Sequence, residues 1–326
     1  MAGSGVLGFV LRRLLSVVPT VLAILVVTFG MIQLAPGDAV DALAGAGGDE
    51  ATNDYLRAYL QLDRPVWQQF GSYAFRLAQG DLGVSFVQGG TPVSDLILDR
   101  LPATLLLMGT ALVLSSVGGV LLGALIARWP YGRFDAGVSS ASLVTDALPG
   151  FWLAQLVVLV FAIKAGWFPV QGMTDAREQY TGLAAYADVA EHLVLPALVL
   201  ATAELALVTR VARAGLLAER GRDYVRTARA KGMRERRTIL VHALPNAMLP
   251  VATVVGTRLG FLFAGAVVIE TVFGWPGLGT LLLTASQSRD RPVLLGLVLL
   301  VSLSVVLANL VTDLAYGWID PRVRQR

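Results

Sequence analysis

The apolar residues of this chain gather into six long stretches that carry few charges. Each stretch approaches or exceeds the roughly 20 residues that a helix needs to cross a bilayer core of about 30 Å. The stretches are Leu14–Leu34, Ala103–Ala127, Val138–Ile163, Leu193–Thr209, Ala247–Phe273 and Val293–Gly317. The pattern predicts an all-α integral membrane protein with six transmembrane helices. It also predicts kinks at Pro149, Pro196 and Pro250, which lie within or at the start of spans.

Composition agrees with a membrane protein and removes several kinds of chemistry. Apolar residues make up 55% of the 326 positions and charged residues 15%, and the mean hydropathy is +0.66. The sequence contains no Cys, so a disulfide framework, a Cys-ligated metal and a thiol nucleophile are excluded. It contains only two His residues, His192 and His242, which argues against a His-rich metal site.

The distribution of Lys and Arg predicts the orientation in the membrane. When the segments between spans are assigned to alternate sides, one side holds 17 basic residues and the other holds 8. Long loops follow the positive-inside rule poorly, so we leave out the loop 36–100, and the contrast becomes 17 to 4. Both termini are therefore expected on the cytoplasmic side.

The outer loop 36–100 is longer than a connection between two helices requires. Its aromatic and apolar residues could bury one face of short helices on the outer membrane surface, and it is expected to fold. It could serve as a structural cap or as a docking surface for another protein. We divide the chain into residues 1–35 with the first span, 36–100 as an extracytoplasmic subdomain, and 101–326 as the core with the other five spans and the inner segment 210–246.

The sharpest local signal lies in the inner segment Arg210–Asn246. Ten basic residues stand against three acidic ones there, a local charge of +7, which orientation and attraction to anionic lipid can explain. The segment also predicts a short helix with small residues on one face, stopped by a glycine. Such a helix can enter the cleft of a partner protein. The residues that we assign to docking are Tyr224, Ala228, Ala230, Gly232, Ile239, His242 and Pro245.

Four of the charged residues within or near the ends of predicted spans are candidates for a functional site, because a charge at mid-depth costs about 2.5–3.5 kcal/mol. They are Asp146, Glu204, Arg258 and Glu270. They could line a translocation path, or they could pair between helices or snorkel to the surface. The glycine pairs Gly119/Gly123 and Gly256/Gly260 have the spacing of close helix packing.

Several stretches resemble the dipeptide, oligopeptide and nickel permease family of ATP-binding-cassette (ABC) importers. The inner segment has Gly232, Ile239 and Leu244-Pro245 where that superfamily has them, and Arg226-Thr227-Ala228 where the consensus has an acid-Ala-Ala triplet. The other similar stretches are Asp223–Gly232, His242–Asn246, Glu270–Gly279, Gly80–Gly83 with Ser85-Phe86, and Asp320–Arg322.

The resemblance implies the fold of a type I ABC importer permease in the bacterial inner membrane. It implies that this chain forms half of a path for peptides that works by alternating access. The implied partners are a second homologous permease, two cytoplasmic ABC ATPases that bind ATP and Mg, and an extracytoplasmic substrate-binding protein, with lipid around the spans. The inner segment would then transmit ATPase closure to the helices.

The sequence also bears on the competing functions. It has no Gly-x-x-x-x-Gly-Lys-Ser/Thr phosphate loop, so we expect no ATPase activity, cofactor, metal or nucleic acid bound by this chain. A proton-coupled secondary transporter that uses intramembrane carboxylates remains the alternative. It leaves the patterned inner segment unexplained, and no inverted repeat is evident. The sequence also lacks the motifs of an intramembrane hydrolase.

Overall fold

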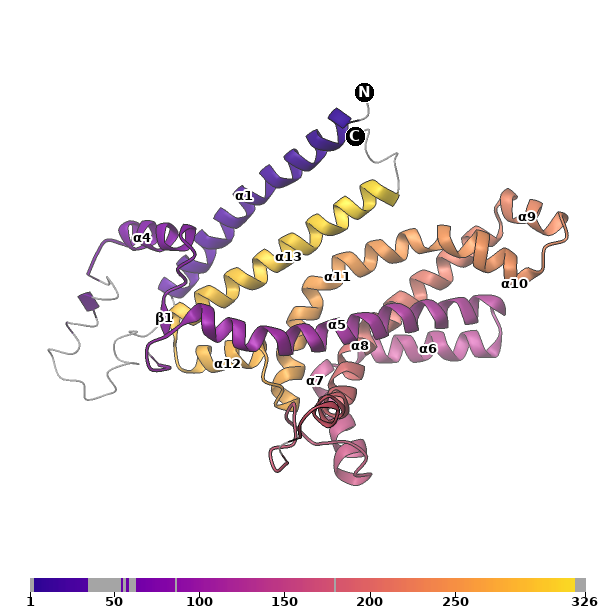
Figure 1. The fold of residues 1–326 in the computed structure, drawn as a ribbon. Coiled ribbons are helices and arrows are strands. Elements are labelled where there is room, and N and C mark those ends of the chain that lie inside the picture. The colour runs from indigo at the N-terminus through magenta and orange to yellow at the C-terminus, as the bar shows by residue number, and fades with distance from the viewer. Residues whose placement is uncertain are drawn as a thin grey trace. The chain divides into compact units, whose positions relative to one another are not determined.

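The computed structural model describes residues 3–34, 54, 57–58, 63–85, 87–178 and 180–319, and these are almost entirely helical (Figure 1). Four of the described helices are long and apolar enough to cross a membrane, or up to six spans if each of two bent helix pairs counts as one. Contacts divide the chain into two compact units. Unit 1 is 1–103 with 277–307, and unit 2 is 104–276 with 308–326.

Unit 1 contains the first helix, the described part of the outer loop and a short hairpin. Its elements are α1 (Gly3–Leu34), α4 (Val66–Ala78), β1 (Val84–Ser85), β2 (Thr91–Pro92), the start of α5, α12 (Leu278–Gln287) and most of α13 (Arg291–Ile319). β1 and β2 pair antiparallel, with Val84 opposite Pro92.

The outer loop in unit 1 packs partly through aromatic rings, as the sequence predicts for this region. The ring of Phe29 on α1 lies 5.4 Å from that of Phe70 and 6.2 Å from that of Tyr73, both on α4. The Ser85 hydroxyl donates a hydrogen bond to the carboxylate of Asp290, which joins the hairpin to the turn before α13. The expectation that residues 36–53 fold lies outside the described residues.

Unit 2 is built around two long helices that pack against each other, α8 (Leu183–Arg220) and α11 (Leu244–Phe273). The other elements are most of α5 (Val93–Arg128), α6 (Arg133–Ala147), α7 (Gly150–Val157), η1 (Val158–Lys164), α9 (Asp223–Ala230), α10 (Glu235–Arg237), η2 (Thr238–Ala243) and the end of α13. With 38 residues, α8 is about 57 Å long. It therefore extends beyond the predicted span Leu193–Thr209 at both ends.

The predicted single span Val138–Ile163 is two helices that meet at 106°, α6 and the continuous pair α7–η1. The break falls where Leu148 has an extended backbone before Pro149. Proline disfavours a helical conformation in the preceding residue and has no N–H to donate, so the kink expected at Pro149 becomes a full break.

Close packing of α5 on α8 confirms the role predicted for one glycine pair. A Cβ added at Gly119 would lie 2.7 Å from Val208 Cβ, and one at Gly123 would lie 2.7 Å from Ala212 Cβ and 2.8 Å from the Thr209 carbonyl oxygen. A Cβ added at Gly256 would likewise lie 2.3 Å from Thr312 Cγ2. Any larger side chain at these positions would push the helices apart.

Candidate coupling segment and intramembrane polar network

Helix α9 is short because both of its ends are set by local backbone geometry. It starts after Arg222, whose backbone is extended, and it carries Asp223 in its first turn, where a carboxylate favours the positive end of the helix dipole. At its other end Gly232 adopts φ +79°. Its N–H bonds to the Arg229 carbonyl at 2.9 Å, and Met233 N–H bonds to the Ala228 carbonyl at 3.3 Å. This is a Schellman ending, which confirms the predicted stop at Gly232.

One face of α9 is buried against its own chain. Val225 is fully buried in a cluster with Ala127, Leu216, Ala243 and Ala247, and Ala228 is also buried. Ala228 therefore packs inward and is not on the exposed face. The exposed face offers Arg226, Thr227, Ala230 and Gly232.

A first polar clamp fixes the start of α9 to both long helices. The Tyr224 hydroxyl donates to the carboxylate of Glu219 near the end of α8. It accepts a hydrogen bond of 3.0 Å from the side-chain amide of Asn246 on α11. Partial burial raises the pKa of Tyr224, and the bond to Glu219 adds to this, so the phenol stays protonated and can donate.

A second clamp fixes the end of α9. Arg229 binds the Glu235 carboxylate through two hydrogen bonds of 2.9 and 2.8 Å, and this raises the pKa of Arg229. Arg220 on α8 donates to the same carboxylate at 3.1 Å and also to the carbonyl of Ala127 on α5. Together the two clamps join α9 to α8, α10 and α11.

Elsewhere in unit 2, Asp135 on α6 forms the most buried of the described ion pairs between an arginine and a carboxylate. Arg213 on α8 donates to its carboxylate at 2.6 and 2.5 Å, and Tyr131 N–H donates at 2.8 Å. Tyr131 has φ +63°, and its ring lies 5.7 Å from the Arg213 guanidinium. The turn between α5 and α6 is thereby fixed to α8.

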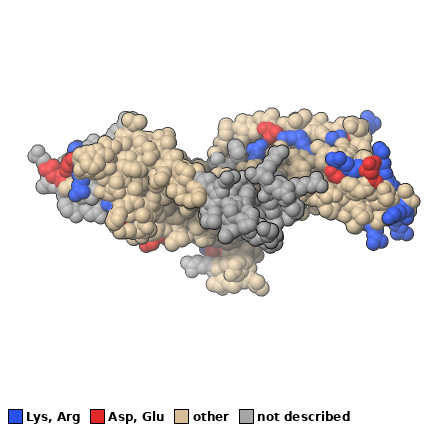
Figure 2. All heavy atoms as spheres, turned by 90° about the horizontal axis from the view of Figure 1, so that it is seen from above, with Lys and Arg blue, Asp and Glu red and all other residues tan. Residues whose placement is uncertain are grey.

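The remaining predicted docking residues lie along η2 and the start of α11. Ile239 is half-buried against the cluster beneath α9. His242 is half-buried and its carbonyl accepts from Asn246, while Pro245 is exposed. Basic side chains surround an open hollow of about 660 Å³ beside them, lined by Lys231, Gly232, Met233, Arg234, Arg236, Arg237, Leu240 and Val241. Figure 2 shows the gathering of Lys and Arg at the end of unit 2 that α9 and α10 form in Figure 1.

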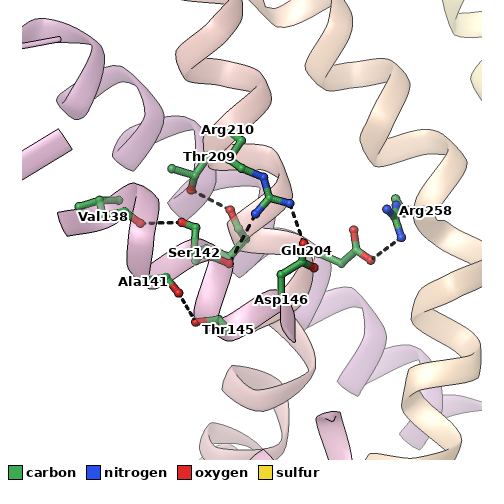
Figure 3. A network of polar contacts seen from close by, with 10 residues as sticks. Val138, Ala141, Ser142, Thr145, Asp146, Glu204, Thr209, Arg210 and Arg258 are labelled. Carbon is green, nitrogen blue, oxygen red and sulfur yellow. Dashed lines mark hydrogen bonds and ion pairs between the residues drawn. The ribbon is translucent and has the colours of Figure 1, made fainter. Parts of the chain in front are cut away.

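A polar network lies at the break between α6 and α7 (Figure 3). Arg210 on α8 donates to Asp146 at 2.9 Å and to the Ser142 carbonyl at 3.5 Å. Glu204, also on α8, faces Arg258 on α11 at 3.9 Å. The structure thus pairs three of the four charged residues expected within or near spans.

The fourth, Glu270, is fully buried and accepts a hydrogen bond of 2.6 Å from Thr104 on α5. Burial and the bond to Thr104 fit a role of Glu270 in pairing helices better than a position along an open translocation path.

Sequence reasoning did not find several of the residue pairs that form these networks. Asp135 and Arg213 are 78 positions apart, and Tyr224 and Asn246 are 22 apart, so no local pattern connects them. Glu235 is six residues after Arg229, beyond the glycine turn, which helical spacing rules do not cover.

The chain can now be compared with known proteins. Residues 119–325 match the family described as "Binding-protein-dependent transport system inner membrane component", and residues 6–108 match its N-terminal part. The chain belongs to this family. It is the membrane-spanning permease subunit of an ABC transport system and is located in the inner membrane.

Individual relatives cover nearly the whole chain. The oligopeptide transport system permease protein AppB of Bacillus subtilis (strain 168) is 36% identical over 315 residues, 97% of this chain and 98% of that protein. The dipeptide transport system permease protein DppB of Escherichia coli (strain K12) is 39% identical over 338 aligned positions, 98% of this chain and 99% of that protein.

A solved structure shares the fold at much lower identity. A chain of the MetNI methionine ABC transporter matches with a TM-score of 0.53 and 15% identity, over 69% of this chain and 96% of that chain. The family match and the two relatives confirm the family predicted from the sequence motifs and support the ATP-driven function, not the proton-driven alternative.

Proposed function

We propose that this chain forms half of the membrane path of an ABC importer for peptides. The observation that carries the proposal is the near full-length identity of 36–39% to permeases named for oligopeptide and dipeptide transport. The proposal includes the type I permease fold with six spans, both termini in the cytoplasm, and a folded outer loop between the first two spans.

The working complex contains three kinds of partner in this proposal. A second, homologous permease completes the path, and two cytoplasmic ATPases bind ATP and Mg. An extracytoplasmic substrate-binding protein delivers the peptide. This chain binds no cofactor itself and contributes the helices that alternate between outward and inward access.

The proposed point of energy input is helix α9. Its exposed face, with Arg226, Thr227 and Ala230, contacts the ATPase, while Val225 and Ala228 hold it to this chain. The clamps at Tyr224 and Arg229 prevent α9 from moving independently of α8 and α11. ATPase closure then moves the two helices that carry Glu204 and Arg258.

Peptide uptake into proteoliposomes tests the proposal directly. The complete complex, with loaded binding protein outside and ATP inside, is expected to accumulate a radiolabelled dipeptide against its gradient. Omission of ATP or of the binding protein is expected to abolish uptake. Uptake driven by a pH gradient without nucleotide would contradict the proposal and favour the proton-coupled mechanism.

A further inference from the structure

The cavity beside the α6–α7 break is small and is lined by four helices of unit 2. Its volume is about 250 Å³, below the roughly 300–1,000 Å³ of sites that enclose a drug-sized ligand. Its walls come from the end of α6 and the start of α7, from α8, and from α11. They consist of Thr145, Leu148, Gly150, Phe151, Leu153, Val199, Leu200, Thr202, Ala203, Glu204, Gly265, Val268 and Ile269. It can hold one terminal residue of a peptide but not a whole peptide.

The polar groups of this wall are hydrogen-bond acceptors. The Thr202 hydroxyl donates its proton to the Val199 carbonyl at 2.7 Å, and the Thr145 hydroxyl donates to the Ala141 carbonyl at 2.8 Å. Each hydroxyl has only one proton, so what it can offer to the cavity is a lone pair. The third polar residue, Glu204, is a carboxylate. A ligand group that fits this lining must donate hydrogen bonds and carry positive charge.

The negative charge of Glu204 is also poorly compensated for a side chain that is mostly buried. Its side chain is 12% exposed, and its charged neighbour Arg258 lies 3.9 Å away, too far for a hydrogen bond. Within the described ranges, the Glu204 carboxylate accepts no hydrogen bond. The nearby Asp146, by contrast, is bonded to Arg210 at 2.9 Å. A buried carboxylate without hydrogen bonds is costly, and a ligand that donates to it recovers that cost.

We propose that this cavity binds the terminal ammonium group of the transported peptide, with Glu204 as the counter-ion and the apolar walls receiving the adjacent side chain. The inference rests on the proposed peptide import and adds a site to it. Since Glu204 is close to the middle of α8, the site would hold the peptide partway along that helix.

Charge-selective labelling tests the site. The chain has no cysteine, so Ala203→Cys in the cavity wall introduces the only thiol of this subunit. In the assembled complex, a cationic methanethiosulfonate reagent is expected to modify this thiol about tenfold faster than an anionic reagent of similar size, as expected for one nearby charge that is partly screened. Glu204→Gln leaves the positive charge of Arg258 beside the site and should abolish the preference for the cationic reagent, whereas Glu204→Asp should keep it.

The matched control is Glu191→Gln, because Glu191 is an exposed carboxylate thirteen residues earlier on the same helix, about 20 Å away along the axis. It should leave the ratio unchanged. A dipeptide with a free amino terminus should slow the labelling, and its N-acetylated form should not. Two results would overturn the proposed site. One is equal labelling rates for the two reagents in the Ala203→Cys protein that keeps Glu204, and the other is equal protection by both peptides. Such a result combined with ATP-driven peptide uptake would leave the proposed import standing.

Discussion

Replacing Asp135 by Asn should destabilise unit 2. The loss should exceed that from neutralising the acidic partner of any other ion pair described in this unit. The Asp135 side chain is 4% exposed and the Arg213 side chain 22%, and two short hydrogen bonds join them. Asparagine has nearly the same shape and can still accept the bond from Tyr131 N–H. It leaves the guanidinium of Arg213 without its counter-charge.

The size of the effect follows from this burial. Removal of one partner from a buried ion pair typically costs about 3–5 kcal/mol. Water still reaches part of Arg213, so we expect a cost near the lower end, about 3 kcal/mol. The same substitution at Asp146, whose side chain is 48% exposed beside a 30% exposed Arg210, should cost about 1 kcal/mol or less.

The assay compares the free energy of unfolding of the two variants in denaturant titrations of the purified complex. The Asp135→Leu and Arg213→Met variants, alone and combined, complete a double-mutant cycle, in which the double variant should be more stable than Asp135→Leu alone. If Asp135→Asn is no more destabilising than Asp146→Asn, the argument that this pair fixes the α5–α6 turn to α8 is refuted.

Three further predictions concern packing, burial and the clamps. Gly123→Ala should cost about 1–3 kcal/mol of stability because its Cβ meets Ala212 and Thr209, whereas Gly232→Ala, with nothing within 4 Å, should cost only the left-handed backbone energy of about 1–2 kcal/mol. Unchanged thermal stability of the Gly123→Ala variant would contradict the close packing of α5 on α8. Tyr73→Phe should stabilise the protein by about 1 kcal/mol, because the buried Tyr73 hydroxyl has no hydrogen-bond partner among the described residues. Burial also raises the pKa of Tyr73 to about 12, so the folded state keeps this proton longer than the unfolded state, and wild-type stability should fall between pH 10 and 12 while Tyr73→Phe loses less. Tyr224→Phe removes two hydrogen bonds of the first clamp and should lower the number of peptides imported per ATP hydrolysed by several-fold, with basal ATPase activity unchanged; an unaltered ratio would show that the clamp is not needed for coupling.

Local signals in the sequence predicted local structure well. The glycine that ends α9, the bend at Pro149, predicted as a kink and found as a full break, and the close approach at Gly119 and Gly123 each depend on the backbone or volume of one or two residues. Those properties can be read without knowing the fold.

Features that depend on distant segments could not be read in this way. The sequence predicts that the small residues of α9 share one face, but in the structure Ala228 packs inward while Ala230 is exposed. Which face is buried depends on the position of η2 and α8 beneath α9. Likewise the sequence showed that Glu204 and Arg258 are charged residues in spans. Their separation of 3.9 Å depends on how α8 packs on α11, and the cavity beside Glu204 depends on the angle of α7.

The central claim is that the exposed face of α9 is where an ATPase subunit acts on this permease. Ala230→Cys places the only cysteine of the chain on that face, and Thr174→Cys places it in the exposed segment after η1, which is predicted to lie on the outer side. With a short bifunctional thiol reagent applied to the assembled complex, the account predicts a cross-link from Ala230→Cys to the ATPase subunit and none from Thr174→Cys. An α9 thiol that reacts freely with a monofunctional reagent, yet forms no cross-link to the ATPase in either nucleotide state, would contradict the account.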